Sequence, residues 1–294
     1  MISIVIPAYN EEAVIGRCLS ALTATAAPGE FEIIVACNGC RDHTAARARE
    51  FGPLVRVVET PQASKIAALN LGDRAATAFP RCFIDADVVV SADAVRQVAQ
   101  ALQTGAVHVA APALHVDVSR SSWAVRAFYA IWLKTPYHQA GTIGSGFFAL
   151  SQTGRARFEA FPPIIADDAF VRALFRPAER ATLRDCHFTI QAPRTLPDLI
   201  KIKTRSRLGL YELAARFPQL PGHGHPTRHS SSAWLRSPAS WPAAAVYLYV
   251  NVVTRLRARR QKASLQTYQW ERDESSRTIE TSSTAPGPSV TSPL

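Results

Sequence analysis

Two carboxylates separated by one residue are the first candidates for chemistry in this sequence. Asp85 and Asp87 follow the apolar run 82–84 directly, so both side chains leave a strand on one loop. At this spacing they can share a cation, and Mg²⁺ or Mn²⁺ held by few protein carboxylates keeps coordination positions open for phosphate oxygens. The alternative role is helix capping, because Ser91 and Asp93 place capping residues close by.

Two cysteines with the spacing Cys37-x-x-Cys40 suggest zinc or redox chemistry. A structural zinc site requires a second pair of ligands at a suitable spacing. The cysteine and histidine at 186–187 and the histidines of the segment 223–229 are distant in the chain and stand in unrelated contexts. Five scattered cysteines do not suggest a disulfide framework either. The simpler expectation is that Cys37 and Cys40 pack as small residues at a strand end.

Alternating strands and helices are predicted to position these residues. The β-branched run 2–6, stopped by Pro7, has the character of a buried parallel strand. A helical stretch opens at Asn10 with acidic residues in its first turn, Asp42 precedes a second, and residues 64–79 form a third. Further strands are expected at 31–36, 54–58 and 82–84. This alternation predicts a parallel sheet with helices on both faces.

Polar residues gather at one edge of this predicted sheet. Tyr9 and Glu11 follow the first strand, and Asn38 follows the second. Asp85 and Asp87 follow the fourth. Ligands of such sheets bind at the carboxyl ends of the strands. One crevice at that edge is therefore expected to collect these side chains.

Positive charge is concentrated in the last third of the chain. Residues 1–193 carry 18 Lys and Arg against 17 Asp and Glu, whereas residues 194–294 carry 15 against 6. A basic C-terminal third indicates an anionic partner, such as a diphosphate or an anionic lipid surface. Nucleic acid is not expected, because no recognition motif accompanies the charge. The chain opens on the run 2–6 rather than on a secretory leader, so a cytoplasmic protein is expected.

The C-terminal region departs from the alternating pattern. An apolar segment at 241–253 is followed at once by basic residues at 255–262. About a dozen apolar positions fall short of the ~20 that span a bilayer. The segment is expected either to lie peripherally on an anionic leaflet at the inner face of the cell membrane or to pack on the body of the protein. The aromatic stretch 123–132 could contact lipid, form a platform for an acceptor molecule, or belong to the hydrophobic core.

Four motifs follow one another along the chain. They are Val5-Ile-Pro-Ala-Tyr-Asn-Glu-Glu12, Cys37-Asn-Gly-Cys-Arg-Asp-His-Thr44, Lys65-Ile-Ala-Ala-Leu-Asn70 and Phe83-Ile-Asp-Ala-Asp87. They stand in the order seen in family 2 glycosyltransferases, and the chain resembles that family over residues 1–210. The resemblance implies a GT-A fold, a Rossmann-like α/β fold with a mostly parallel sheet flanked by helices. A nucleotide-sugar-binding half is then expected at 1–115 and an acceptor half at 116–210. A basic, partly amphipathic extension at 211–265 and a disordered tail at 266–294 would follow.

The resemblance also implies roles for residues at matching positions. Asp85 would lie near the ribose of the donor, and Asp87 would be the stronger ligand of a divalent Mn²⁺ or Mg²⁺ ion. Asp168 would be the catalytic base, with Asp167 in place of the usual glutamate. The implied donor-binding residues are Pro7, Ala8, Tyr9, Glu11, Asp85, Ala86 and Asp87, to which Asn38 and Lys65 are added as neighbours at the same edge. The implied acceptor loop is Gly144, Ser145 and Gly146, followed by Asp167.

These roles predict an inverting glycosyltransferase that moves a sugar from a nucleotide-diphosphate donor to a hydroxyl of a glycan, polysaccharide or lipid-linked acceptor. Asp168 would take the hydroxyl proton while the cation stabilises the departing diphosphate. A sugar nucleotidyltransferase is a second interpretation, but it should carry a glycine-rich basic loop where this chain has Glu11 and Glu12. A catalytically silent binding protein with the same fold is a third. An acidic helix start is the structural alternative for Asp167 and Asp168.

The chain departs from the family pattern at two places. Cys37 and Asn38 stand where the family commonly has an acidic pair contacting the base, so a uracil preference is not predicted. The Gln-x-x-Arg-Trp element of polymerising members is absent, and Lys203, Arg205 and Arg207 occupy that region. These three could meet the diphosphate from a flexible loop, or they could form the solvated face of a strand or helix.

Overall fold

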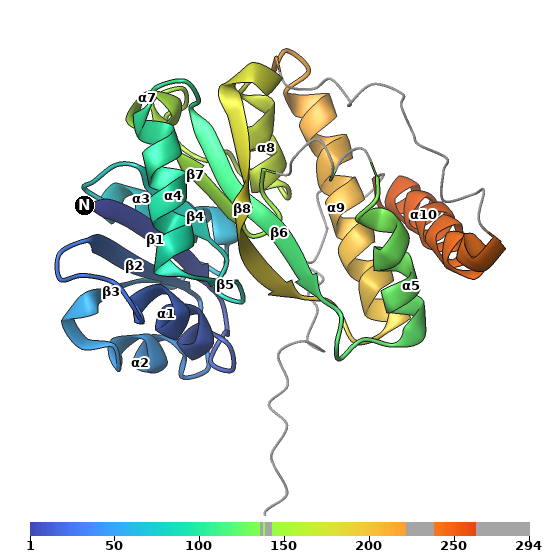
Figure 1. Cartoon of the computed structure of the whole chain (residues 1–294), viewed down its shortest axis with the longest axis horizontal. Helices are drawn as coiled ribbons and strands as arrows, with labels where there is room; N and C mark the ends of the chain where they lie inside the picture. The colour runs from blue at the N-terminus through green and yellow to red at the C-terminus, as the bar shows by residue number, and fades with distance from the viewer. Residues whose placement is uncertain (136–137, 139–142, 222–237, 263–294) are drawn as a thin grey trace, which may run out of the picture.

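The computed structural model describes residues 1–135, 138, 143–221 and 238–262 (Figure 1). The strands are β1 (Ile2–Ala8), β2 (Phe31–Asn38), β3 (Val55–Thr60), β4 (Arg81–Ile84), β5 (Val89–Val90), β6 (Val109–Asp117), β7 (Phe147–Leu150) and β8 (Arg180–Gln191). The helices are α1 (Ile15–Thr23), α2 (Thr44–Arg49), α3 (Lys65–Ala75), α4 (Ala92–Gln103), α5 (Trp123–Trp132), α7 (Gln152–Arg155), α8 (Asp167–Ala173), α9 (Leu196–Arg216) and α10 (Trp241–Lys262). The tail expected at 266–294 lies outside the described residues.

The described strands form one eight-stranded sheet in the order β3-β2-β1-β4-β7-β6-β8-β5. β1 is parallel to both β2 and β4, and β2 is parallel to β3, as the alternation of strands and helices predicts. β7 runs antiparallel to both of its neighbours, and the short β5 runs antiparallel to β8. In Figure 1, α4 lies in front of the sheet and α3 behind it, so helices cover both faces. The expected α/β fold with a mostly parallel sheet is therefore confirmed.

β1 continues through Pro7, although the sequence predicts that Pro7 ends the strand. The Ser3 nitrogen donates to the Pro80 carbonyl next to β4, and alternate residues of a strand point to the same side. β1 pairs with β4 only over residues 3–5. Pro7 would therefore point its missing N–H toward β4, but the pairing with β4 has already ended there, so no hydrogen bond is lost. On the other side, Pro7 stays paired with Ala36 of β2.

α1 begins at Ile15, so the prediction of a helix that opens at Asn10 with an acidic first turn is wrong. Asn10 has a left-handed backbone with φ of 52°, and the Glu11 N–H donates to Thr44 Oγ1 at 2.7 Å. This segment is therefore tied to the loop after β2 instead of coiling into a helix. The helical spacing itself is confirmed, because the buried face of α1 carries Ile15, Cys18, Leu19 and Leu22.

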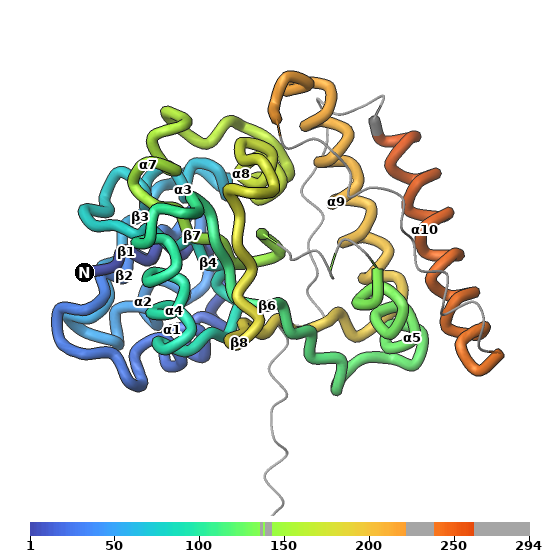
Figure 2. The backbone as a smooth tube through the Cα atoms, turned by 45° about the horizontal axis from the view of Figure 1, so that its top comes forward, coloured from blue at the N-terminus to red at the C-terminus, as the bar shows by residue number. Residues whose placement is uncertain are grey.

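α5, α9 and α10 form a helical unit beside the sheet (Figure 2). Its small core contains Val116, Val125, Phe128, Tyr129, Ala192, Leu199, Ile200 and Val250. Residue 210, where the sequence places the end of the catalytic domain, lies inside α9. The apolar run expected at 241–253 forms the first part of α10. Among the described helices, none combines the length and the apolar character needed to cross a membrane.

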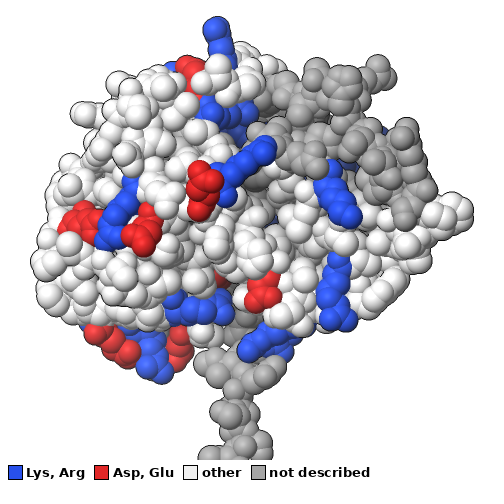
Figure 3. All heavy atoms as spheres, in the orientation of Figure 1, with Lys and Arg blue, Asp and Glu red and all other residues white. Residues whose placement is uncertain are grey.

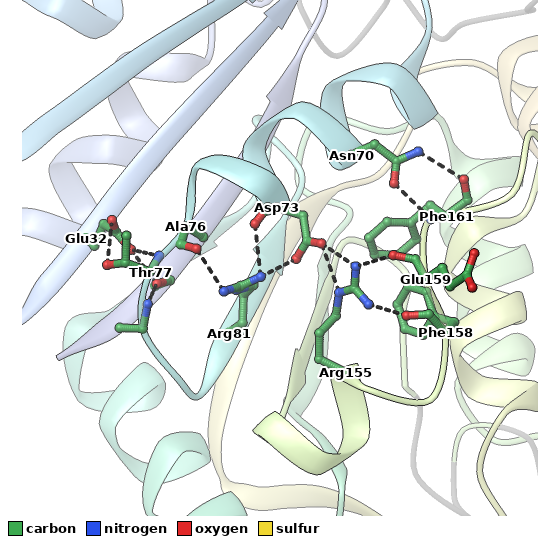
Figure 4. Close-up of polar contacts among 12 residues, drawn as sticks. Glu32, Asn70, Asp73, Ala76, Thr77, Arg81, Arg155, Phe158, Glu159 and Phe161 are labelled. Atoms are coloured by element: carbon green, nitrogen blue, oxygen red, sulfur yellow. Dashed lines mark hydrogen bonds and ion pairs between the residues drawn. The ribbon is translucent and has the colours of Figure 1, made fainter.

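A buried ion-pair network joins α3, the start of β4 and α7 (Figure 4). Asp73 of α3 accepts from Arg81 Nη1 at 2.6 Å and from Arg155 Nε at 2.9 Å. Arg81 also donates to the backbone carbonyls of Asp73 and Ala76. The Asp73 side chain is 5% exposed, so a single buried carboxylate serves as the shared anion of both guanidinium groups.

Candidate active site

One cavity of about 1360 Å³ opens at the carboxyl ends of β1, β2 and β4 and continues to the helical unit. The predicted site residues that line it are Pro7, Tyr9, Glu11, Asn38, Lys65, Asp85, Ala86, Asp87, Ser145, Gly146, Asp167, Asp168, Lys203, Arg205 and Arg207. Ala8 and Gly144 are not part of this lining, but each contacts a residue that is: the Ala8 carbonyl accepts from Asn38, and Gly144 lies against Asp168. The edge of the sheet therefore collects the residues that its strand order predicts.

The strand ends of β1 and β2 are held together by side chains of the second strand and its turn. Asn38 is 2% exposed, and its Nδ2 donates to the Ala8 carbonyl at 2.8 Å. The Cys40 sulfur lies 3.4 Å from the same carbonyl, and the Asn10 N–H donates to that sulfur at 3.5 Å. The amide nitrogen of Asn38, a predicted donor-binding residue, is thus engaged in positioning the loop that carries Tyr9.

Cys37 and Cys40 lie beside this loop as free thiols. The Cys37 thiol hydrogen-bonds to the Cys40 sulfur and lowers the pKa of Cys40 to about 6; burial opposes this effect and the N–H of Asn10 reinforces it. The same hydrogen bond, followed by burial, raises the pKa of Cys37. In the part of the chain that the structure describes, no cluster of three metal-ligating side chains forms, here or elsewhere.

A tight turn presents the two carboxylates after β4. The Val88 N–H donates to the Asp85 carbonyl at 3.1 Å, and the Asp85 N–H donates to the Gly146 carbonyl at 2.9 Å. Ala86 is 3% exposed and anchors the turn, while the side chains on either side of it reach the cavity. In this Asp-x-Asp motif the middle residue is therefore buried, and the carboxylates of Asp85 and Asp87 are partly exposed.

Lys65 bridges the two halves of the site. Its Nζ lies 2.8 Å from Asp85 Oδ1 and 3.2 Å from Asp167 Oδ2. Burial alone would lower the pKa of Lys65, but the carboxylates of Asp167 and Asp85 outweigh it and raise that pKa. Burial raises the pKa of Asp167 to about 6 against the opposing charge of Lys65. Lys65 thus stays protonated and joins the turn after β4 to the start of α8.

Asp168 is oriented by backbone groups. Its Oδ2 accepts from the Ser145 N–H at 2.9 Å, and its Oδ1 accepts from the Ala169 N–H at 2.7 Å. Gly144 has a φ of +102°, and a Cβ at this position would lie 2.6 Å from Asp168 Oδ2. The expected glycine-containing loop therefore lies against Asp168 and leaves space for its carboxylate.

The three basic residues near position 205, for which the sequence leaves open a flexible loop or the face of a strand or helix, lie on a helix. Lys203, Arg205 and Arg207 belong to α9, where residues four apart share a face and residues two apart do not. Lys203 Nζ lies 3.7 Å from the centre of the Trp132 ring, and Arg207 Nη2 donates to Asn251 Oδ1 at 3.0 Å. The flexible loop is therefore excluded and the helix is confirmed, although Lys203 and Arg207 contact partners within the helical unit instead of forming a solvated face. Diphosphate contact by any of the three residues stays a prediction.

Sequence reasoning missed several side chains that line the cavity. Arg172 stands four residues after Asp168 on α8, and that helical spacing was the available signal. α10 contributes Tyr247, Asn251 and Thr254. Only folding brings that helix to the site. The core role anticipated for the aromatic stretch of α5 is confirmed, since Phe128 and Tyr129 belong to the core of the helical unit; both also line the cavity.

Solved structures with a similar fold are glycosyltransferases. A mannosyltransferase of Pyrobaculum calidifontis, PcManGT, solved with GDP-Man and Mn²⁺, matches with a TM-score of 0.61 and 20% identity over 91% of this chain and 81% of its own. Glucosyl-3-phosphoglycerate synthase of Mycobacterium tuberculosis, solved with Mn²⁺ and UDP-Glc, matches with a TM-score of 0.53 and 25% identity over 78% of this chain and 86% of its own. These likenesses show that the fold is of the GT-A type.

Sequence comparisons agree with the fold. Glycosyltransferase AglE of Haloferax volcanii is 34% identical over 91 residues, which are 29% of this chain and 30% of that protein. The matched stretch is thus less than a third of that relative's length. The sequence profile described as "Glycosyl transferase family 2" matches residues 3–161, which is more than half of the chain. The protein therefore belongs to glycosyl transferase family 2.

Proposed function

We propose that this protein is a metal-assisted, inverting glycosyltransferase that moves a sugar from a nucleotide-diphosphate donor to an acceptor hydroxyl. The observation that carries the proposal is that Asp87 and Asp168, 81 positions apart in the sequence, line one cavity of about 1360 Å³. This volume exceeds the roughly 300–1,000 Å³ that is typical of a pocket for one small ligand. A donor and an acceptor fit together in such a cavity.

The donor half would hold the nucleotide at the ends of β1 and β2. Tyr9 and Pro7 line this part of the cavity and offer flat, apolar surface to a base. Arg172 and Arg205 also line the cavity, and guanidinium groups suit the oxygens of a diphosphate. The positive charges of these two side chains would stabilise the departing diphosphate.

The turn after β4 fits a divalent cation. Mg²⁺ is commonly bound by one or two carboxylates together with substrate phosphates, and the oxygen ligands of Asp85 and Asp87 match this chemistry. Asp87 would be the main protein ligand, because Asp85 is already paired with Lys65 at 2.8 Å. When bound, the cation would neutralise the charge that develops on the diphosphate. The Mn²⁺ in both similar solved structures agrees with this assignment.

Asp168 would act as the general base toward the acceptor hydroxyl. Its carboxylate is held by two backbone N–H groups, one from the Gly144–Gly146 loop and one from α8. Such fixed orientation favours proton transfer along a single direction. The aromatic side chains Phe128 and Tyr129 line the same cavity and would offer a platform for the acceptor. A glycan, polysaccharide or lipid-linked acceptor has a hydroxyl and a ring or chain that fit this arrangement.

Replacing the base tests the proposal. Asp168→Asn should lower kcat by roughly 10²- to 10⁴-fold, the usual contribution of a general base, and leave nucleoside diphosphate binding unchanged. The assay follows release of nucleoside diphosphate from a panel of nucleotide sugars with Mn²⁺ and an acceptor. Asp185→Asn is the matched control, because Asp185 is an exposed residue of β8 outside the cavity.

The same assay separates the other readings of the fold. Turnover of Asp168→Asn within a few-fold of the unmodified enzyme would contradict the role of the base. Pyrophosphate release from a nucleoside triphosphate and a sugar phosphate would instead identify a nucleotidyltransferase. Nucleotide binding without any turnover would identify a silent binding protein. Retention of the anomeric configuration, followed by NMR of the product, would contradict inversion.

A further inference from the structure

Exposed apolar side chains gather on the helical unit. Among the described residues, ten large hydrophobic side chains are exposed, and eight of them belong to α5, α9, α10 or Leu133, the residue directly after α5. Those on α10 are Trp241, Leu248, Tyr249, Val252 and Leu256, each between 51% and 59% exposed. Exposed apolar groups that cluster in this way mark an interaction surface.

The exposed residues of α10 share one face of the helix. Leu248, Val252 and Leu256 are spaced four residues apart, and Tyr249 lies beside them. The opposite face is buried, as Ala244, Val250 and Ala258 are each at most 5% exposed against α5 and α9. We call the outward stripe of Trp241, Leu248, Tyr249, Val252 and Leu256 the α10 outer face.

Basic side chains continue the α10 outer face at the C-terminal end of the helix. Arg255, Arg259 and Arg260 are exposed, and α10 contains no acidic residue. On the side of the molecule shown in Figure 3, acidic and basic side chains both lie over the sheet. The charged side chains seen over the helical end are basic. An anionic surface therefore complements this face in charge, and its apolar stripe would be removed from water by insertion between head groups.

We propose that the α10 outer face docks the protein on an anionic lipid surface. A helix that lies in the interface needs an apolar stripe, amphipathic aromatic residues and basic residues, and all three are present. The inner side of the same helix contributes Tyr247 and Asn251 to the cavity. Docking would therefore place the acceptor end of the cavity directly beside the head groups. Membrane docking is independent of the proposed chemistry and is measured without turnover.

Vesicle binding by the full chain tests this. The protein should co-sediment with vesicles of phosphatidylglycerol and phosphatidylcholine and bind phosphatidylcholine vesicles much more weakly. Each arginine near an anionic leaflet strengthens binding by roughly fivefold, so Arg255→Gln/Arg259→Gln/Arg260→Gln should weaken it by up to about 100-fold. Binding should also fall with salt, because the screening length shrinks from about 10 Å at 0.1 M to about 3 Å at 1 M.

Apolar contacts are tested by a second variant. Leu248→Gln/Val252→Gln/Leu256→Gln should weaken binding to anionic vesicles at least tenfold, with unfolding temperature unchanged because these side chains are exposed. The controls are Leu54→Gln, which is 49% exposed, and Arg47→Gln on α2, at the other end of the molecule (Figure 1). Asp168→Asn should bind vesicles like the unmodified protein even if it lacks turnover.

Three results would overturn the proposal. The first is no binding of the full chain to anionic vesicles. The second is equal vesicle binding by the unmodified protein and both triple variants. The third is self-association in light scattering that the apolar triple variant abolishes, since this would assign the α10 outer face to a second copy of the chain.

Discussion

Single residues in the site act largely through the backbone around them. The carboxylate of Asp168 is aimed by the N–H groups of Ser145 and Ala169, and Gly144 leaves the space that it occupies. The sulfur of Cys40 supports the loop after β1 in a similar way. Small changes at such residues should therefore move a neighbouring group instead of removing a contact with substrate.

Gly144→Ala should reduce turnover by displacing Asp168. The added Cβ would lie 2.6 Å from Asp168 Oδ2, so the carboxylate has to move, and a misplacement of about 1 Å costs on the order of 10²-fold in rate. The measurement is kcat with the preferred nucleotide sugar. Gly105→Ala is the matched control, because Gly105 also has a positive φ (+75°) but has open space around its Cβ position. Equal kcat for both variants would contradict this contact.

Cys40 should be the thiol that reacts first with iodoacetamide. The hydrogen bond from Cys37 lowers the pKa of Cys40 to about 6, and the Asn10 N–H contributes to this lowering. The Cys40 side chain is also partly exposed. The reactive thiolate then predominates above about pH 6, whereas an ordinary thiol reacts mainly above pH 8. Mass spectrometry after alkylation at a series of pH values gives the midpoint. Cys82, whose pKa is raised by burial, should react only on unfolding, and a Cys40 midpoint near 9 would contradict this prediction.

At the scale of elements, buried ion pairs fix how α3, β4 and α7 sit around the sheet. Asp73 on α3 holds Arg81 at the start of β4 and Arg155 at the end of α7 (Figure 4). Asn70, one turn earlier on α3, accepts from the Phe161 N–H at 2.8 Å and donates to the Phe161 carbonyl at 3.0 Å. The same helix carries Lys65 at its first position, so its placement also sets the bridge between Asp85 and α8.

Asp73→Asn should destabilise the protein strongly. The change leaves Arg81 and Arg155 without their anion, and loss of one partner of a buried pair costs roughly 3–5 kcal/mol. Urea unfolding measures the difference in unfolding free energy. Asp93→Asn removes one of the two carboxylate partners of Arg96 on α4, but the Asp93 side chain is 72% exposed and Glu30 remains, so the loss should stay below about 1 kcal/mol. Similar losses for the two variants would show that burial of the network does not matter.

At the scale of the whole molecule, the helical unit closes one side of the cavity. α9 packs on α5 and α10, and Lys203 of α9 lies over the Trp132 ring with its Nζ 5.4 Å from the centre of Phe128. Burial of this ammonium lowers the pKa of Lys203 to about 7. Protonation of one lysine is thus linked to how the helices pack against one another.

Lys203→Met should stabilise the protein at neutral pH and less so at alkaline pH. The folded state releases the Lys203 proton above about pH 7, whereas the unfolded chain keeps it up to 10.5. Between these values the unfolded state binds more protons, so the unfolding free energy of the unmodified protein rises with pH. Thermal unfolding of both proteins at pH 7 and pH 10 measures the difference. Lys201→Met, at a 44% exposed lysine of the same helix, should show no such trend, and a pH-independent difference for Lys203→Met would contradict the shift.

Local patterns in the sequence predicted the first four strands of the sheet and many of the polar residues that line the cavity. The runs before Pro7, Asn38 and Asp85 are apolar with period-two or continuous character, and these signals depend only on neighbours along the chain. Because parallel strands end at a common edge, the polar residues that follow them were expected together, and the cavity contains them. The alternating charges at Lys203, Arg205 and Arg207 do not predict one secondary structure, because they are compatible with a loop, a strand and a helix.

The sequence by itself determined the order of the first four strands and the helices between them, and the polar residues that follow β1, β2 and β4, because periodicity and turn chemistry are local. Only the tertiary structure decided that Lys65 pairs with Asp85 and Asp167, that Gly144 lies against Asp168, and that α10 forms a wall of the cavity. Each of these contacts joins residues at least 20 positions apart, so it depends on how whole elements pack. That packing is set by summed burial over many side chains, which no single motif records.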